Sequence, residues 1–204
     1  MKEYIEKART YDEYTTLLDE LLAEGESTGP NQSAEKVGFA KLNRQRMRRV
    51  EKTVVVSEAL GGALRNVTRP MIWLVISEGW CGDGAQIVPV IEKIAAESDK
   101  IETRHLLRDE NLDLMDRLFP DAPRSIPRLI VLDAGTFEIL GTWGTRPAAG
   151  QEYFEKLKAD GIEKSVILEE MQRWYNSDKG ASLQREFETL IGIWNGKKAA
   201  SATN

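Results

Sequence analysis

The stretch from Ile76 to Pro89, ISEGWCGDGAQIVP, decides the fold of this chain. It continues an apolar run, MIWLVIS from Met71, which has the length and the unbroken apolarity of a strand buried on both faces. From Gly84 to Glu97 the apolar residues fall on one helical stripe, with Pro89 among them. The single cysteine, Cys81, therefore lies where a buried strand passes into a helix.

That position gives the sulfur of Cys81 a special environment. The first turn of a helix presents unpaired N–H groups and the positive end of the helix dipole, which favour a thiolate. We therefore expect Cys81 to be exposed and nucleophilic, with a pKa below the ordinary value of about 8.5, rather than an inert buried residue. Glu78 and Asp83 flank the sulfur and oppose the thiolate, but we expect both carboxylates to turn into solvent. Asp83 is either a proton relay or, as we favour, a stabilising acid in the first helical turn.

The same stretch resembles the active-site region of the thioredoxin superfamily. The resemblance rests on a strand, then residues 80–82 (Trp-Cys-Gly), then a helix with Pro89 eight residues after the cysteine. A second anchor is residues 125–127 (Ser-Ile-Pro) before the apolar run RLIVLD, which resembles the loop that carries the thioredoxin cis-proline. The flanking helical segments, including KLNRQRMRR, look like those of bacterial thioredoxin-like proteins of the WCGD type.

The resemblance implies an α/β, thioredoxin-like fold, with a central mixed β-sheet flanked by helices and with extra N- and C-terminal helices. It implies that Cys81 is the catalytic residue and that the substrate-binding residues are Trp80, Gly82, Asp83, Gly84, Ile126 and Pro127. No metal and no organic cofactor is implied. An external low-molecular-weight thiol, such as glutathione or an equivalent, is implied as co-substrate, and a protein disulfide or a protein-thiol adduct is implied as the partner.

Two departures from the thioredoxin pattern leave two functions open. Thioredoxins carry Cys-x-x-Cys, but position 84 is glycine, so no internal thiol can resolve a mixed disulfide at Cys81. Val75 stands where thioredoxins commonly keep a buried aspartate for proton transfer. We expect a monothiol thiol-disulfide oxidoreductase whose mixed disulfide is resolved by an external thiol. The alternative is a redox-inactive thioredoxin-fold interaction module that holds a partner protein at the cleft between Cys81 and Pro127.

We expect residues 1–196 to form one thioredoxin-like domain. Its core lies at about 71–143, with an N-terminal helical arm at 1–68, C-terminal helices at 147–195 and a flexible tail at 197–204. In the arm, Thr10 and Glu13 form a capping-box pattern at the start of one helix. A second helix runs through Lys41 to Val50 and on towards Leu64, weakened near residues 61–62 (Gly-Gly).

Within the core we expect four strands. They begin at Met71, Ile101, Arg128 and Phe137, and the last reaches Trp143. The strand from Met71 and the strand near Ile101 should be parallel, and the strands from Arg128 and Phe137 should be antiparallel to the first.

Composition narrows the class of protein further. Hydrophobic residues make up 41% of the 204 residues, enough for a sizeable core, so a wholly disordered chain is excluded. One cysteine and one histidine exclude an intrachain disulfide framework and a Cys/His zinc cluster. No apolar run reaches the roughly 18 residues of a membrane span. The N-terminal sequence lacks a secretory signal, so we expect a cytoplasmic protein with no membrane partner.

The basic run from Lys41 to Lys52, in which Glu51 is the only acid, is typical of a nucleic-acid or acidic-partner surface. The chain carries a net charge of −5 and the run lacks interleaved aromatic residues, so we do not expect nucleic acid as a partner. We interpret the run as a solvated helix face with local ion pairs. Residues 108–110 (Arg-Asp-Glu) follow a strand end and either line the cleft or cap the next helix, and we interpret His105 as structural.

Overall fold

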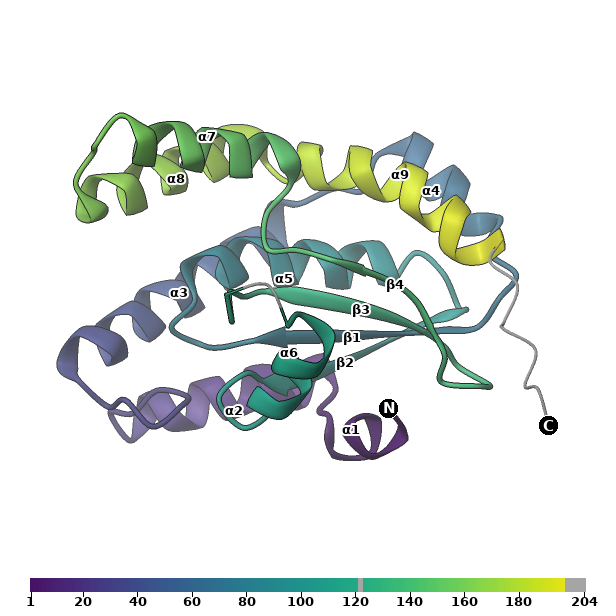
Figure 1. The fold of residues 1–204 in the computed structure, drawn as a ribbon, viewed down its shortest axis with the longest axis horizontal. Helices are drawn as coiled ribbons and strands as arrows, with labels where there is room; N and C mark the ends of the chain where they lie inside the picture. Colours follow the sequence, from purple (N-terminus) through teal and green to yellow (C-terminus); the bar gives the residue numbers. More distant parts are fainter. Residues whose placement is uncertain (121–122, 197–204) are drawn as a thin grey trace.

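The computed structural model describes residues 1–120 and 123–196, and its centre is a four-stranded sheet (Figure 1). The strands, in the order β2-β1-β3-β4 across the sheet, are β1 (Met71–Ser77), β2 (Ile101–Leu107), β3 (Arg128–Asp133) and β4 (Ile139–Trp143). β1 is buried over its whole length, as its unbroken apolar sequence predicts. The predicted α/β fold with a central mixed sheet and flanking helices is confirmed.

The strand directions follow the prediction for three strands and contradict it for the fourth. β1 pairs in parallel with β2 and antiparallel with β3, as predicted. β4 pairs antiparallel with β3, so it runs in the direction of β1, and the prediction that it opposes β1 is wrong. Because β3 already runs opposite to β1, the tight turn after β3 returns β4 to the direction of β1. Phe137, with φ 60°, belongs to this turn, so the strand begins at Ile139 rather than at Phe137.

Two layers of helices cover the two faces of the sheet (Figure 1). The first layer contains α4 (Glu58–Arg65), α5 (Gly82–Ala95), α8 (Lys164–Asp178) and α9 (Ala181–Gly196). The second layer contains α1 (Lys2–Lys7) and α6 (Leu112–Leu118). Because successive strand residues point to opposite faces, Trp73 and Val75 of β1 contact the first layer, and Ile72 and Leu74 contact the second. Cys81 belongs to the core of the second layer.

The N-terminal helices differ from the prediction at one break. α2 (Tyr11–Ala23) begins with the predicted capping box between Thr10 and Glu13. α3 (Ala34–Thr53) does not continue towards Leu64, because the chain becomes extended at Val54 and α4 begins after Ser57, whose hydroxyl accepts from the Leu60 N–H at 3.2 Å. Three consecutive valines favour extended backbone and a serine caps a new helix. The break therefore lies before the glycines at 61–62, which sit inside α4.

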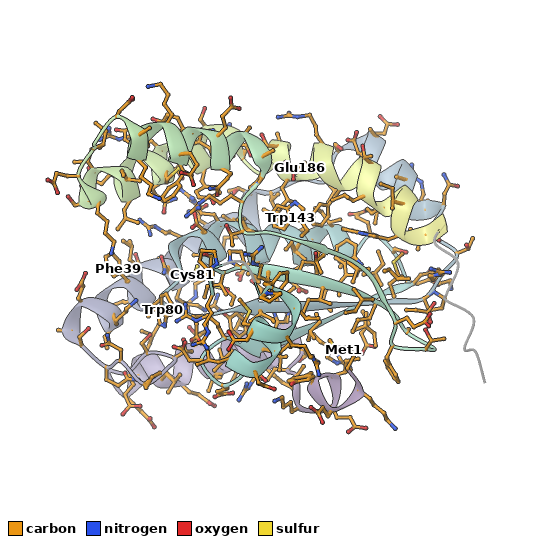
Figure 2. The ribbon with its side chains drawn as sticks, viewed as in Figure 1. Met1, Phe39, Trp80, Cys81, Trp143 and Glu186 are labelled. Atoms are coloured by element: carbon orange, nitrogen blue, oxygen red, sulfur yellow. The ribbon has the colours of Figure 1, made fainter. Side chains whose placement is uncertain are left out.

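The C-terminal helices attach to the sheet through aromatic side chains. The rings of Trp73, Phe187 and Trp194 meet edge to face, with centroids 5.5 to 5.8 Å apart. Trp143 of β4 donates its indole N–H to Glu186 of α9 at 2.7 Å, and both residues are labelled in Figure 2. α7 (Ala148–Ala159) packs beside α8 on this side of the molecule. The tail predicted at 197–204 lies outside the described residues, and within them no helix combines the length and apolarity of a membrane span.

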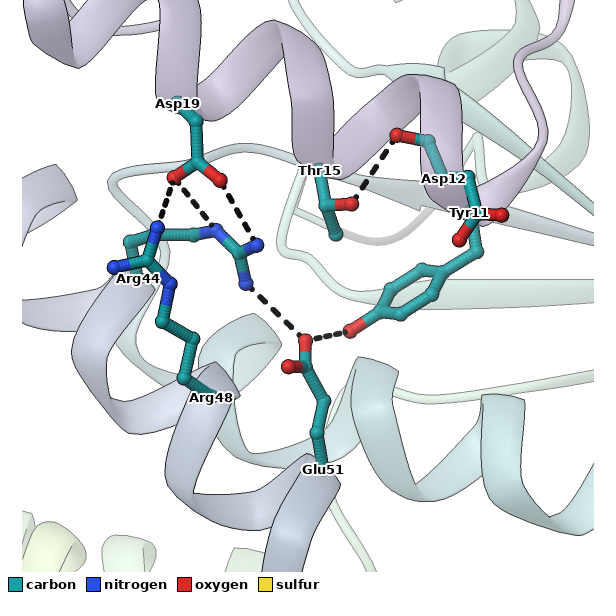
Figure 3. A network of polar contacts seen from close by, with 7 residues as sticks. All are labelled: Tyr11, Asp12, Thr15, Asp19, Arg44, Arg48 and Glu51. Carbon is teal, nitrogen blue, oxygen red and sulfur yellow. Dashed lines mark hydrogen bonds and ion pairs between the residues drawn. The ribbon is translucent and has the colours of Figure 1, made fainter.

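The basic run of α3 forms ion pairs with α2 (Figure 3). Arg44 is buried and donates two hydrogen bonds to Asp19 at 3.0 and 3.1 Å and one to Glu51 at 3.2 Å. Arg48 donates to the same Asp19 at 2.9 Å, and Tyr11 donates to Glu51 at 2.7 Å. The interpretation as a solvated face with local pairs is therefore wrong for Arg44, which joins two helices through an acid 25 residues away.

Candidate functional site

Cys81, labelled in Figure 2, forms the N-cap of α5, and three residues separate it from the end of β1. Its sulfur accepts a hydrogen bond from the Gly84 N–H at 3.3 Å, as expected for a residue that caps a helix. Its S–H donates to the carbonyl oxygen of Ile126 at 3.4 Å. The side chain is buried, with 7% of its surface exposed, so the expectation of an exposed cysteine is wrong.

Burial raises the pKa of the Cys81 thiol to about 12, and the negative charge of Asp83 adds to the increase. The N–H groups of Gly84 and Asp83 and the charge of Arg146 act in the opposite direction but are outweighed. The expectation of a populated thiolate at neutral pH is therefore wrong. A helix N-terminus stabilises a thiolate that water also reaches, whereas here the sulfur has lost that water.

Asp83 lies in the first turn of α5 and forms a partly buried ion pair. Arg146 donates to its two carboxylate oxygens at 2.6 and 3.1 Å, and Tyr175 donates to Oδ1 at 2.7 Å. Only 16% of the Asp83 side chain and 15% of the Arg146 side chain are exposed. Asp83 therefore does not turn into solvent, and its charge stays close enough to Cys81 to oppose the thiolate.

Arg146 reaches this position because of a glycine in the preceding loop. Gly144 has φ +124°, and a Cβ there would overlap the carbonyl oxygen of Pro127. Only glycine lets the loop after β4 pass this close to residue 127. The sequence gives no local sign that residues 83, 146 and 175 meet, because they are 63 and 92 residues apart along the chain.

Glu78 is also buried rather than solvated. Its Oε1 accepts from the Asp109 N–H at 2.8 Å. Burial raises the pKa of this carboxyl, and the charge of Asp109 adds to the increase. Both acids that flank Cys81 in the sequence are therefore held inside the protein, contrary to expectation.

The two glycines in the first turn of α5, Gly82 and Gly84, differ in the space around them. A Cβ on Gly84 would overlap Ser77 Oγ and would lie 3.4 Å from the sulfur of Cys81. A Cβ on Gly82 would meet nothing within 4 Å. At position 84, where thioredoxins have their second cysteine, Ser77 Oγ therefore occupies the space that a side chain would need. At position 82 that space is free.

The loop at residues 125–127 lies opposite Cys81, as the resemblance implies. The peptide bond between Ile126 and Pro127 is cis, and both residues are buried. The carbonyl of Ile126 is the group that binds the cysteine S–H. The Cys81 thiol therefore donates to a main-chain carbonyl of the loop that the resemblance assigns to substrate binding.

Two cations lie close to the ring of Trp80 at the rim of the site. Lys36 Nζ lies 3.6 Å from the centroid of its ring, and the guanidinium carbon of Arg108 lies 4.7 Å from it. Arg108 also donates to Asp109 and to the carbonyl of Arg124, so residues 108 and 109 line the site instead of capping α6, whose N-cap is Asn111. Sequence reasoning missed Lys36, since no pattern relates it to Trp80.

His105 lies on β2, where its Nε2 is 2.7 Å from Glu92 and its ring stacks on Tyr14 at 5.3 Å.

Within residues 1–120 and 123–196 no group of three or more His, Cys, Asp or Glu side chains is placed to hold a metal ion. Cys81, Trp80, Asp83, Gly84 and Ile126 thus come together in one polar and apolar cluster that has no metal-binding geometry.

The chain is similar to one protein family and to solved structures. A family model described as Thioredoxin matches residues 29–158, a segment that holds the whole sheet and Cys81. A crystal structure of an HIV epitope-scaffold is 20% identical with a TM-score of 0.57, over 93% of this chain and all of that chain. A crystal structure of a protein of unknown function from Pseudomonas aeruginosa is 21% identical with a TM-score of 0.48, over 92% of this chain and 95% of that one. No curated protein matches the chain.

Proposed function

The chain belongs to the thioredoxin family, and we propose that it acts as a thioredoxin-fold protein-interaction module in which Cys81 stays a protonated thiol. The observation that carries this proposal is the hydrogen bond from the buried Cys81 S–H to the Ile126 carbonyl. A thiol must lose its proton to attack a disulfide. Burial and the charge of Asp83 both raise the pKa of Cys81, so a thiolate at neutral pH is disfavoured.

The proposed interaction surface is the rim around Trp80. Its half-buried ring combines apolar area with two nearby cations, Lys36 and Arg108, of which Arg108 also pairs with Asp109. The few residues that dominate the binding energy of protein interfaces are enriched in tryptophan, tyrosine and arginine. The surface suits a partner protein with a carboxylate near an apolar side chain, bound without a covalent step. We further propose that the protein acts in the cytoplasm, where a lone thiol stays reduced.

Site-directed photo-crosslinking in lysate of the source cells tests this proposal. A photoreactive residue replaces Arg124, which is exposed and borders the loop at 125–127, and the control places it at the exposed Lys158 of α7. We expect a partner to be captured from position 124 and not from 158. Capture should survive Cys81→Ser and should be lost with Trp80→Ala. Loss of capture with Cys81→Ser would contradict a non-covalent module.

The monothiol oxidoreductase is the second candidate, favoured by the Gly84 N–H that points at the sulfur of Cys81. After a partner opens the loop and hydrates the thiol, that N–H would stabilise a thiolate. The thiolate would attack one sulfur of a disulfide and displace the other as a thiolate, which leaves a mixed disulfide at Cys81. An external low-molecular-weight thiol would then attack the mixed disulfide and release reduced Cys81, because Gly84 offers no second sulfur.

The two candidates differ in a disulfide-exchange assay. With a glutathionylated peptide as substrate and reduced glutathione as reductant, the module predicts a rate equal to the uncatalysed rate. The oxidoreductase predicts turnover that disappears in Cys81→Ser. Turnover in the wild type would therefore replace the first proposal by the second.

A further inference from the structure

A cavity of about 330 Å³ lies on the other side of α5 from Cys81, between α3 and the turn that joins α8 to α9. Its apolar wall consists of Val50, Val54, Ile87, Val90 and Leu183. The turn closes one side, where a Cβ on Gly180 would lie 3.2 Å from both methyl groups of Val90. The volume is at the lower end of the range of small-molecule sites.

The polar end of the cavity presents a cation without an acid. Arg49 donates to Gln86 Oε1 at 3.1 Å and to Asn176 Oδ1 at 2.6 Å. Both partners are neutral amides, and Arg49 forms no ion pair within the described residues. The amides hold the guanidinium in place at the cavity without neutralising its charge. An oriented, unpaired guanidinium is a ready binding group for a carboxylate.

The amide of Gln86 provides an independent sign of a missing ligand. Gln86 is 5% exposed, yet its Nε2 has no acceptor in the part of the chain that the structure describes. A buried donor without an acceptor is costly, and such a donor beside a cavity fits a site that a ligand acceptor completes. The carboxylate in the described lining, Asp178, is already engaged by the backbone N–H and hydroxyl of Ser182. Lys179, which also lines the cavity, adds a second positive charge.

We propose that this cavity binds a small monocarboxylate with an apolar body. The carboxylate lies against Arg49 and accepts from Gln86 Nε2, and the apolar body lies against the valine and leucine side chains of the wall. The proposal does not depend on the reactivity of Cys81, because no sulfur chemistry enters it. Tyr175 lines the cavity and donates to Asp83, so the two sites share one side chain.

Titration with octanoate tests the proposal. Binding is measured by calorimetry and by the methyl NMR signals of Val54, Val90 and Leu183. We expect saturable binding of one octanoate per chain, with 1-octanol at least about tenfold weaker because it lacks the charge. Arg49→Met should weaken octanoate binding by about tenfold or more. Arg48→Met is the matched control, because Arg48 lies on the same helix but pairs with Asp19, and it should bind like the wild type.

A second variant separates loss of binding from loss of structure. Val54→Phe fills the cavity from a half-buried position at the end of α3, so it should abolish octanoate binding while the urea unfolding midpoint stays close to that of the wild type. Three results would each overturn the proposal: no saturable binding to the wild type, equal affinity for octanoate and 1-octanol, or unchanged affinity in a folded Arg49→Met. Methyl shifts confined to residues outside the cavity would overturn it as well.

Discussion

Cys81 and Asp83 lie two residues apart at the same end of α5, yet the fold gives them opposite kinds of polar partner. Both can accept hydrogen bonds from the first N–H groups of the helix, and both are largely buried. Asp83 receives a cation from Arg146 and a hydroxyl from Tyr175. Cys81 instead faces the carbonyl oxygen of Ile126. That oxygen can accept a hydrogen bond from a thiol but cannot donate one to a thiolate.

The contrast teaches that a helix N-terminus does not by itself decide ionisation. The helix dipole contributes on the order of 1 kcal/mol at a partly exposed terminus. Removing a charge from water costs more than that unless a partner replaces the water. Arg146 is such a partner for Asp83, whereas among the described residues no cation forms a hydrogen bond with the sulfur of Cys81.

The largest effect is expected when Asp83 loses its cation. Arg146→Met leaves a buried carboxylate with one hydroxyl donor, so the free energy of unfolding should fall by about 2 to 3 kcal/mol. Urea unfolding measures this. Arg173→Met, which removes the ion pairs of an exposed arginine with Glu169 and Glu170 on α8, is the control and should cost at most about 0.5 kcal/mol. Equal losses in the two variants would show that the Asp83 pair is not special.

The Cys81 thiol should make the free energy of unfolding depend on pH. Its pKa is about 12 in the folded protein and about 8.5 when unfolded, so its contribution is fully present below pH 8.5 and is lost as the pH rises towards 12. Between pH 8.5 and 10 the wild type should lose about 2 kcal/mol more than Cys81→Ser. Urea unfolding of both proteins at several pH values measures the difference. Parallel curves would mean that the folded thiol titrates like a free one.

Glycine 84 should tolerate a side chain less well than glycine 82. Gly84→Ala forces Ser77 Oγ to move, at a cost of about 1 to 2 kcal/mol in unfolding free energy. Gly82→Ala meets nothing and should be neutral or slightly stabilising. Adding Ser77→Ala to Gly84→Ala should restore part of the loss. If the double variant is as unstable as the sum of the single ones, the overlap with Ser77 is not the cause.

The smallest effect concerns the hydroxyl of Tyr175. Tyr175→Phe removes one hydrogen bond to Asp83 and leaves the Arg146 pair intact, so unfolding should become easier by about 1 kcal/mol. Tyr153→Phe, whose hydroxyl bonds an acid on the surface of α8, is the control. A loss as large as that of Arg146→Met would assign the stability of Asp83 to the hydroxyl rather than to the cation.

The fold could be predicted because its signals are local. An unbroken apolar run gives β1, a capping box gives the start of α2, and the switch from strand to helix places Cys81 at an N-cap. The direction and the start of β4 are not local signals, because they depend on the tight turn after β3, in which Phe137 takes a positive φ. The break before α4 was missed because three valines followed by a serine are a weaker signal than two glycines.

The ionisation of the site could not be predicted because its causes are distant. Burial of Cys81 depends on Ile126, 45 residues away, and the charge state of its surroundings depends on Arg146, 63 residues from Asp83. Asp19, one of the two acids that bind Arg44, is likewise on another helix. Sequence spacing locates a functional group, whereas its pKa depends on which distant groups the fold brings to it.

The pH dependence of Cys81 alkylation tests the central claim most directly. Iodoacetamide is added to the native protein and to the urea-unfolded chain between pH 6 and pH 10. We expect the native rate at pH 7 to be about a hundredfold below the unfolded rate and to keep rising up to pH 10 without a plateau. A native rate that levels off below pH 8.5, or that exceeds the unfolded rate at pH 7, would contradict a protonated resting thiol.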